Sequence, residues 1–264
     1  MASRSMWKGS ISFGLVNIPA KVYLATESRE LSFNQLCPNG HRIQYKKWCP
    51  IDEKEIGYAD LKKGYQVSKD TYIAIDKKDI ENIKLKTTTS IDVKEFIEAK
   101  ELDPILIERS YYVAPDTKRG SVDKAYSLLV RILSETNKIA IGKVVFKDKE
   151  HVVALRPYQR GIVMHILYYL DEIRPVDEIE GFGDAQKIKT DNKEELSLGK
   201  LLVENLSSKH FDMSKYSDSY TKELKKLVEA KSKGKTYAKP VVKEKEDTKD
   251  LVAALKASLQ KTKK

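Results

Sequence analysis

Two cysteines and their neighbours are the residues best suited to chemistry in this chain. Cys37 is followed four residues later by His41, and Cys49 is followed three residues later by Asp52. Two thiolates, an imidazole and a carboxylate are acceptable zinc ligands. Two Cys-x-x-Cys motifs would predict zinc strongly, but here each turn has only one thiol. The pattern therefore favours packed or free cysteines, with a zinc site at Cys37, His41 and Cys49 as the alternative.

Sequence motifs of the common catalytic sites are absent. We find no Gly-x4-Gly-Lys-Ser/Thr loop, no Gly-x-Gly-x-x-Gly, no His-Glu-x-x-His and no Gly-x-Ser-x-Gly. His165 lies within an apolar segment, which favours a packed or hydrogen-bonded imidazole over a catalytic base. We therefore expect a non-enzymatic protein that needs no cofactor. The enzymatic alternative is a metal-dependent nuclease or a lyase acting through a lysine amine.

Positive charge is concentrated near the C-terminal end of the chain. The formal net charge is +10, and residues 209–264 contain 16 lysines, no arginine and 8 acidic residues. A lysine is a point charge that follows phosphates without reading bases. This tail therefore predicts sequence-independent affinity for nucleic acid, and a solvated tail that only aids solubility is the alternative.

Composition and length also limit where the protein works. No apolar run in the 264 residues approaches the roughly 20 residues that span a bilayer, and the start of the sequence lacks the apolar core of a signal peptide. Two cysteines in a chain of this size fit a reducing compartment. We expect a cytoplasmic protein.

Most of the first 170 residues are typical of short β-strands, because β-branched and aromatic runs alternate with Gly, Pro or lysine-rich connections. Their spacing of about a dozen residues predicts an antiparallel sheet or barrel. Residues 121–135 have apolar side chains at steps of three and four, which predicts one core helix. The fold class is α+β, mainly β. Strands are predicted at residues 7–26 (with a kink), 65–75, 91–99, 105–113, 138–146, 151–155 and 161–170, and a compact unit with a basic hairpin at residues 37–52.

The pattern after residue 181 is helical. A leucine stripe over residues 198–206 predicts one helix, with Asp191 and Glu194 as its capping box. A second stripe over residues 220–228 predicts another helix, which ends at Gly234.

Three parts follow from these patterns. Residues 1–190 form the core, residues 191–234 a helical region, and residues 235–264 a flexible, lysine-rich tail. The tail contains a polar linker and a short amphipathic helix at residues 250–259. A helix of about ten residues is marginal alone, so we expect a partner to order it.

Several blocks of the sequence, in order over nearly the whole chain, resemble one family. They are Met-Trp-Lys-Gly-Ser-Ile-Ser-Phe-Gly-Leu-Val-Asn-Ile-Pro at 6–19, Gly-His-Arg-Ile-Gln-Tyr-Lys-Lys at 40–47, Arg-Ser-Tyr-Tyr-Val-Ala-Pro-Asp at 109–116, Lys-Glu-His-Val-Val-Ala-Leu-Arg-Pro at 149–157, Asp-Glu-Ile-Arg at 171–174, the helix at 216–231 and Asp-Leu-Val-Ala-Ala-Leu-Lys-Ala-Ser at 250–258. The family that they resemble is bacterial Ku, the DNA-end binders of non-homologous end joining.

The resemblance implies a β-barrel core with a protruding bridge arm and two subunits that close into a ring around duplex DNA. It also implies a helical C-terminal part that recruits an ATP-dependent DNA ligase. By position we expect DNA contacts from Arg29, Arg42, Lys46, Lys47, Lys147 and Lys149. We expect the ligase to contact Tyr216, Tyr220, Leu224 and Leu227. Many relatives carry Cys-x-x-Cys where this chain has Cys49-Pro-Ile-Asp52, so the resemblance does not add support for a metal.

A ring loads only from a DNA end, because closed DNA offers no free end to thread. The function implied by the resemblance is therefore sequence-independent binding, protection and bridging of DNA ends in a nucleoid-associated protein of the cytoplasm. The alternative is a general, chromatin-like DNA-coating protein that acts through its basic tail.

Overall fold

The computed structural model describes residues 4–83, 89–117, 122–147, 149–185, 192–237 and 251–262. The chain divides into two compact units, Met1–Arg174 and Pro175–Lys264. Residue 190, where the sequence analysis ends the core, lies outside the described residues. No helix in the described part of the chain has the length and apolar character needed to cross a membrane.

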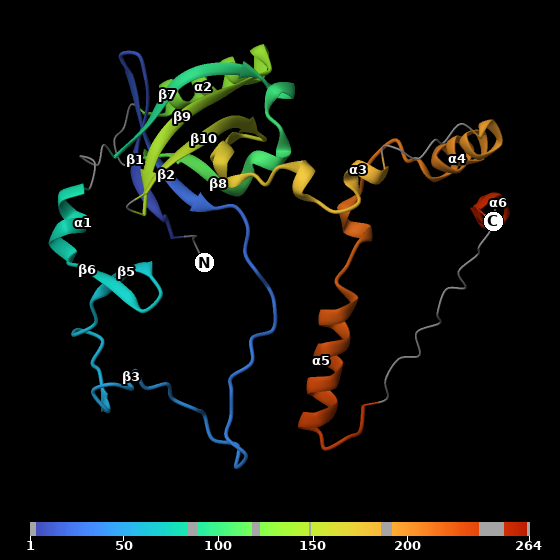
Figure 1. Ribbon diagram of the computed structural model, residues 1–264. Coiled ribbons are helices and arrows are strands. Elements are labelled where there is room, and N and C mark those ends of the chain that lie inside the picture. Colours follow the sequence, from blue (N-terminus) through green and yellow to red (C-terminus); the bar gives the residue numbers. More distant parts are fainter. Residues whose placement is uncertain are drawn as a thin grey trace. The chain divides into compact units, whose positions relative to one another are not determined.

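The first unit is built on a closed barrel of seven strands in the order β1-β2-β8-β11-β10-β9-β7 (Figure 1). Neighbouring strands are antiparallel except at the closure, where β1 and β7 run parallel. The expectation of a mainly β, α+β fold with a barrel core is confirmed. The strands are β1 (Trp7–Phe13), β2 (Val16–Leu24), β7 (Ser90–Glu98), β8 (Ile107–Pro115), β9 (Lys138–Phe146), β10 (Lys149–Tyr158) and β11 (Gly161–Leu167).

The run at residues 6–19 forms β1 and the first part of β2, the hairpin that begins this barrel. Ile11 and Ile18 point into the core and are fully buried. Gly14 has a φ of +57° in the turn, a conformation that glycine adopts without strain. A Cβ on Gly9 would lie 2.1 Å from the backbone oxygen of Thr89, just before β7. Glycine is therefore required where the barrel closes.

Helix α2 (Val122–Thr136) connects β8 to β9 and fills one end of the barrel. Leu129 and Leu133 are buried in the same cluster as the inward-facing strand residues. The Tyr126 hydroxyl donates a hydrogen bond to the Val113 oxygen (2.5 Å) and accepts one from the Ile162 backbone nitrogen (2.9 Å). The one predicted core helix is thus confirmed, and its tyrosine ties it to two strands.

The two ends of the barrel carry different connections. Because β1 and β7 are parallel, β7 begins at the end where β1 begins, and β2 ends there too. β9 runs antiparallel to β7, so the β9–β10 turn lies at this same end. We call it the arm end, because the chain leaves it after Leu24 and returns to it at Ser90. Helix α2 and the β1–β2 and β10–β11 turns belong to the opposite end.

The segment between β2 and β7, residues 25–89, is the arm. Its described residues, 25–83 and 89, form two small sheets and one helix, and none of their described side chains is fully buried. The helix was not predicted from the sequence. The elements are β3 (Trp48–Cys49), β4 (Lys54–Glu55), β5 (Lys63–Ser68), β6 (Thr71–Ile75) and α1 (Lys77–Ile83).

The second unit is helical, as the leucine stripes predict. Helix α6 packs against α4, where Leu259 is buried and Lys256 Nζ lies 2.9 Å from Glu194 Oε1. An open apolar groove of about 520 Å³ runs between these two helices and includes Leu196, Val203 and Leu255. The tail helix therefore has its ordering partner within the chain. The helices are α3 (Phe182–Ala185), α4 (Lys193–Leu206), α5 (Ser219–Ser232) and α6 (Leu251–Thr262).

Four details of the sequence-based prediction are wrong. Residues 65–75 do not form one strand but lie in the hairpin of β5 and β6. The last strand ends at Leu167, because Leu170–Glu172 forms a 3₁₀ turn. Glu194 does not serve a capping box. Asn192 is the N-cap of α4 and accepts a hydrogen bond from the Glu194 nitrogen (3.0 Å), while Asp191 lies outside the described residues. The basic run at residues 42–47 is not a hairpin; tight turns lie on either side of it instead.

His165 lies on the outer wall of the barrel and is buried there, so its predicted role as a hydrogen-bonded residue is confirmed. Its Nε2 accepts a hydrogen bond from Arg156 Nε (2.8 Å), and its Nδ1 lies 2.8 Å from Ser110 Oγ. Burial, and to a lesser extent the Arg156 guanidinium, lower the pKa of His165 below its ordinary value of 6.5. The imidazole is therefore neutral at pH 7, with its proton on Nδ1.

Removing the Tyr126 hydroxyl should destabilise the barrel. Tyr126→Phe leaves the Val113 oxygen and the Ile162 N–H buried without this partner. We expect a loss of about 1–3 kcal/mol in the free energy of unfolding, measured by urea titration. Tyr65→Phe, on the exposed arm, is the control and should change stability by less than about 0.5 kcal/mol. Equal effects of the two variants would contradict this account.

Stability should also fall as the pH drops below about 6.5. The unfolded chain binds a proton on His165 near its ordinary pKa, and the folded chain resists this until lower pH. The contribution of His165 is thus complete above pH 6.5 and is lost on acidification. We expect a shallower decline between pH 7 and 5 for His165→Asn than for the wild type, measured by urea unfolding. The exposed His210→Asn should follow the wild type, and parallel curves for all three proteins would refute the assignment.

Candidate nucleic-acid interface

The arm end of the barrel carries two of the six predicted DNA-contacting residues. Lys147 and Lys149 flank the β9–β10 turn, and Lys147 has a positive φ of 54°. Lys147 Nζ lies 5.8 Å from the centre of the Phe146 ring, and Lys149 Nζ lies 3.7 Å from Glu172 Oε1. The register brings this pair to the end of the barrel from which the arm departs.

The other four predicted residues lie on the arm and are exposed. Lys46 Nζ is 2.7 Å from Glu55 Oε2, across the base of the β3–β4 hairpin. Lys47 Nζ lies 3.9 Å from the centre of the Tyr58 ring. Arg29 and Arg42 complete the set. The structure thus places all six cations on the arm or at the barrel end that carries it.

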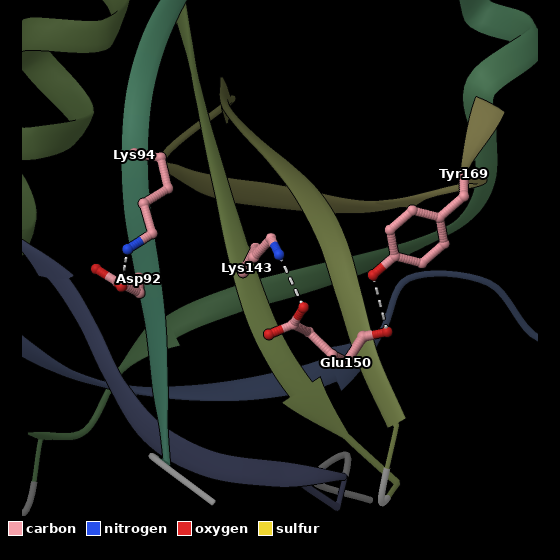
Figure 2. A network of polar contacts seen from close by, with 5 residues as sticks. All are labelled: Asp92, Lys94, Lys143, Glu150 and Tyr169. Carbon is pink, nitrogen blue, oxygen red and sulfur yellow. Dashed lines mark hydrogen bonds and ion pairs between the residues drawn. The ribbon is translucent and has the colours of Figure 1, made fainter. Parts of the chain in front are cut away.

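A group of polar residues on β7, β9 and β10 adds two lysines that the sequence analysis did not select (Figure 2). Lys94 Nζ lies 2.5 Å from Asp92 Oδ2, and Lys143 Nζ lies 2.8 Å from Glu150 Oε2. These side chains line a shallow hollow of about 130 Å³ beside the β9–β10 turn. The alternation along each strand could have predicted that Lys94 and Lys143 point outward. Nothing in the sequence indicated that β7, β9 and β10 lie side by side and bring these lysines together.

Lys143 and Lys46 hold their protons more firmly than an isolated lysine does. Hydrogen bonds to Glu150 and to Glu55 raise the pKa values of Lys143 and Lys46, respectively, above the ordinary 10.5. Both pairs are largely exposed, so water and salt weaken the attraction. A phosphate can therefore compete with the carboxylates for these ammonium groups.

The structure brings together only part of the candidate zinc ligand set. In the turn at residues 36–42, the His41 backbone nitrogen donates to Cys37 Sγ (3.3 Å), and His41 Nδ1 lies 3.8 Å from the same sulfur. Cys49 lies in β3, in the neighbouring β3–β4 hairpin. No group of three or more His, Cys, Asp or Glu side chains arranged to hold a metal ion occurs among the described residues. Both thiols are free.

The four residues predicted to contact a ligase lie on and just before α5. Tyr220, Leu224 and Leu227 share one helix face, in which the tyrosine is exposed and the leucines are partly buried. Tyr216 is exposed and lies with its ring centre 5.9 Å from that of Phe211. Asp218 caps the helix through the Thr221 nitrogen (3.0 Å). The helix thus presents an aromatic start and an aliphatic stripe.

Taken together, these features define a class of α+β proteins: a closed barrel with a long arm inserted between two of its strands and a helical region that follows in the sequence. The model of the Ku70/Ku80 β-barrel domain matches residues 12–198 of the chain. The chain belongs to the Ku family.

Several curated relatives cover nearly the whole chain, and each is named non-homologous end joining protein Ku. The protein of Archaeoglobus fulgidus is 42% identical over 98% of this chain and 100% of its own length. The protein of Desulfitobacterium hafniense is 38% identical over 98% of this chain and 88% of its own length. The protein of Bacillus subtilis is 36% identical over 98% of this chain and 83% of its own length.

Proposed function

We propose that this protein binds the ends of double-stranded DNA in non-homologous end joining, without regard to base sequence. The names of its relatives support this role. The observation that carries the proposal is that the arm and the Lys147–Lys149 turn share one end of a closed barrel. Cations on a rigid wall and on a projecting segment can hold a duplex through its phosphates from two sides.

The working form is a homodimer that closes into a ring through its arms. The arm has a weak core of its own and exposes many large apolar side chains. Monomeric proteins rarely expose so much apolar surface without a partner. A second copy related by a two-fold axis would cover the same patch on both chains. The exposed arm residues include Phe33, Leu36, Tyr45, Trp48, Ile51, Tyr58, Tyr65, Val67, Tyr72 and Ile73.

Within this ring, end recognition is geometric. The DNA threads through the opening from a free end, and lysines and arginines hold its backbone without reading bases. Because exposed ion pairs with phosphate are screened and exchange readily, the ring can also slide inward. The protein acts as a scaffold that protects and bridges ends, without catalysis or a cofactor, in the cytoplasm at the nucleoid. Tyr216, just before α5, and the α5 face of Tyr220, Leu224 and Leu227 recruit an ATP-dependent DNA ligase.

The deciding experiment compares one DNA sequence as a short linear duplex and as a covalently closed minicircle. We expect the full chain to retain the linear form at salt concentrations that release the circle. Blocking both ends of the linear form with bulky hairpins should remove the difference. Simultaneous release of both forms would overturn the ring and would favour a DNA-coating protein that acts through its basic tail.

A tail variant separates these two functions further. Lys239, Lys243, Lys245 and Lys249 changed together to Gln remove four tail charges and leave the α6 sequence intact. Under the proposed function, this variant still prefers the linear duplex over the circle, with weaker overall affinity. If its binding is abolished, the tail is the main DNA-binding element.

The proposed contacts at the arm end should appear in the salt dependence of binding. The logarithm of the binding constant falls linearly with the logarithm of the salt concentration, and each lost phosphate contact makes this slope shallower by about 0.9. We expect Lys147→Gln/Lys149→Gln to lower it by roughly twice that amount, measured by fluorescence anisotropy on a linear duplex. Lys138→Gln is the control, because Lys138 lies at the opposite end and pairs with Glu98 (2.7 Å). An unchanged slope in the double variant would remove these lysines from the interface.

A further inference from the structure

A small aromatic and cationic patch lies on the outer wall of the barrel. The rings of Tyr112 on β8 and Tyr158 on β10 have their centres 6.1 Å apart and their planes at 27°. Their residues are 43% and 38% exposed, so part of each ring faces solvent. The Arg156 guanidinium carbon lies 5.5 Å from the centre of the Tyr158 ring. We call Tyr112, Arg156 and Tyr158 the stacked patch.

The arginine of the stacked patch is held in position from beneath. Arg156 Nε donates to His165 Nε2, and His165 lies directly opposite Ser110 in the β8–β11 register. Because Nε2 is an acceptor, Nδ1 carries the proton and donates to Ser110 Oγ (2.8 Å). Nδ1 therefore cannot accept a proton from the Ser110 hydroxyl, and Ser110 and His165 do not form a catalytic nucleophile and base. These hydrogen bonds instead orient Arg156, since they link β10, β11 and β8 through Arg156, His165 and Ser110.

The surroundings of the stacked patch favour an anionic ligand. Tyr23 on β2 lies next to Tyr112 in the register, and Arg160 is exposed in the β10–β11 turn. Lys21 lies further along β2, 2.8 Å from Asp116. Glu108 is on β8, four residues from Tyr112 toward the arm end. The groups nearest the rings are thus cationic, aromatic or neutral.

The apolar area of the patch is small for a protein partner. On β2, β8, β10 and β11, the large apolar side chains with substantial exposure are Val16, Leu24, Tyr112 and Tyr158. Val16 and Leu24 are at the two ends of β2. A specific protein interface buries about 800 Å² on each partner around an apolar centre. Two partly exposed rings beside one guanidinium are closer in size and chemistry to the face of a nucleobase.

We propose that the stacked patch binds unpaired nucleotides of a single nucleic-acid strand. A base would stack on the tyrosine rings, and Arg156 would face the base or its phosphate. The patch differs from the duplex contacts proposed above, because Tyr158 directly precedes the turn at the opposite end of the barrel. It would give the protein a place for the overhang of a broken end.

The test measures binding of the full chain to a short oligothymidylate and, separately, to a blunt duplex. We expect Tyr112→Leu/Tyr158→Leu to lose about tenfold in affinity for the single strand for each base that stacks. Leucine keeps apolar cover over the buried Val163. Binding to the blunt duplex should be unchanged, which separates this inference from the proposed function. Tyr168→Leu, with a tyrosine that is 40% exposed elsewhere on the unit, is the matched control.

Photocrosslinking tests the stacked patch in the wild-type chain, so the result does not depend on how well the double variant folds. An oligonucleotide carrying 5-iododeoxyuridine should crosslink to Tyr112 or Tyr158 of the wild-type chain. Crosslinks that map only elsewhere, or equal strand affinities of wild type and double variant, would overturn the inference. So would equal competition by a free mononucleotide, because the site would then serve small nucleotides. A double variant that loses self-association while keeping strand affinity would show a protein interface instead.

Discussion

The parallel pairing of β1 with β7 is the contact on which the rest of the structure depends. Ser10–Ser12 and Ser90–Asp92 close the barrel here, between strands that are far apart in the sequence. Glycine is required at two close approaches on either side of β7, one to β1 and one to β9. A Cβ on Gly9 would meet the Thr89 oxygen, and one on Gly142 would lie 2.6 Å from the Asp92 oxygen. This seam sets the two anchors of the arm one strand apart, because β1 pairs with β2 on one side and with β7 on the other.

Charge on the barrel is largely compensated locally. Lys94, Lys143 and Lys149 each lie beside a carboxylate, and Lys8 and Lys21 share the buried Asp116. Such a surface attracts DNA weakly at long range but can exchange carboxylate for phosphate at contact. Most of the net positive charge lies instead in residues 209–264, which hold 16 lysines and 8 acidic residues. This division fits the proposed function, in which the ring slides on DNA as well as holds it.

Much of the fold was predictable because its signals are local. The 3.6-residue period of α2 and the apolar run of β9 gave elements within a residue or two of those observed. The strand pair that closes the barrel was not predictable, because the parallel pairing of two distant strands leaves no mark in either local sequence. Lys94 and Lys143 were missed because the antiparallel pairing of β7 with β9, which also joins distant parts of the sequence, leaves no local mark either. Asn192 was missed as the cap of α4 because Asp191 offers the same chemistry one residue earlier, and only the backbone conformation selects between them.

The position of the arm between β2 and β7 also has a consequence for how the chain can vary. These strands are separated in the barrel only by β1, so the two ends of the arm are held roughly 10 Å apart. For the barrel, the arm is a closed polymer loop, and the entropy of closing a loop grows only with the logarithm of its length. Residues can be added to or removed from the arm at little cost to barrel stability. The reach of the arm is therefore free to evolve separately from the wall that holds it.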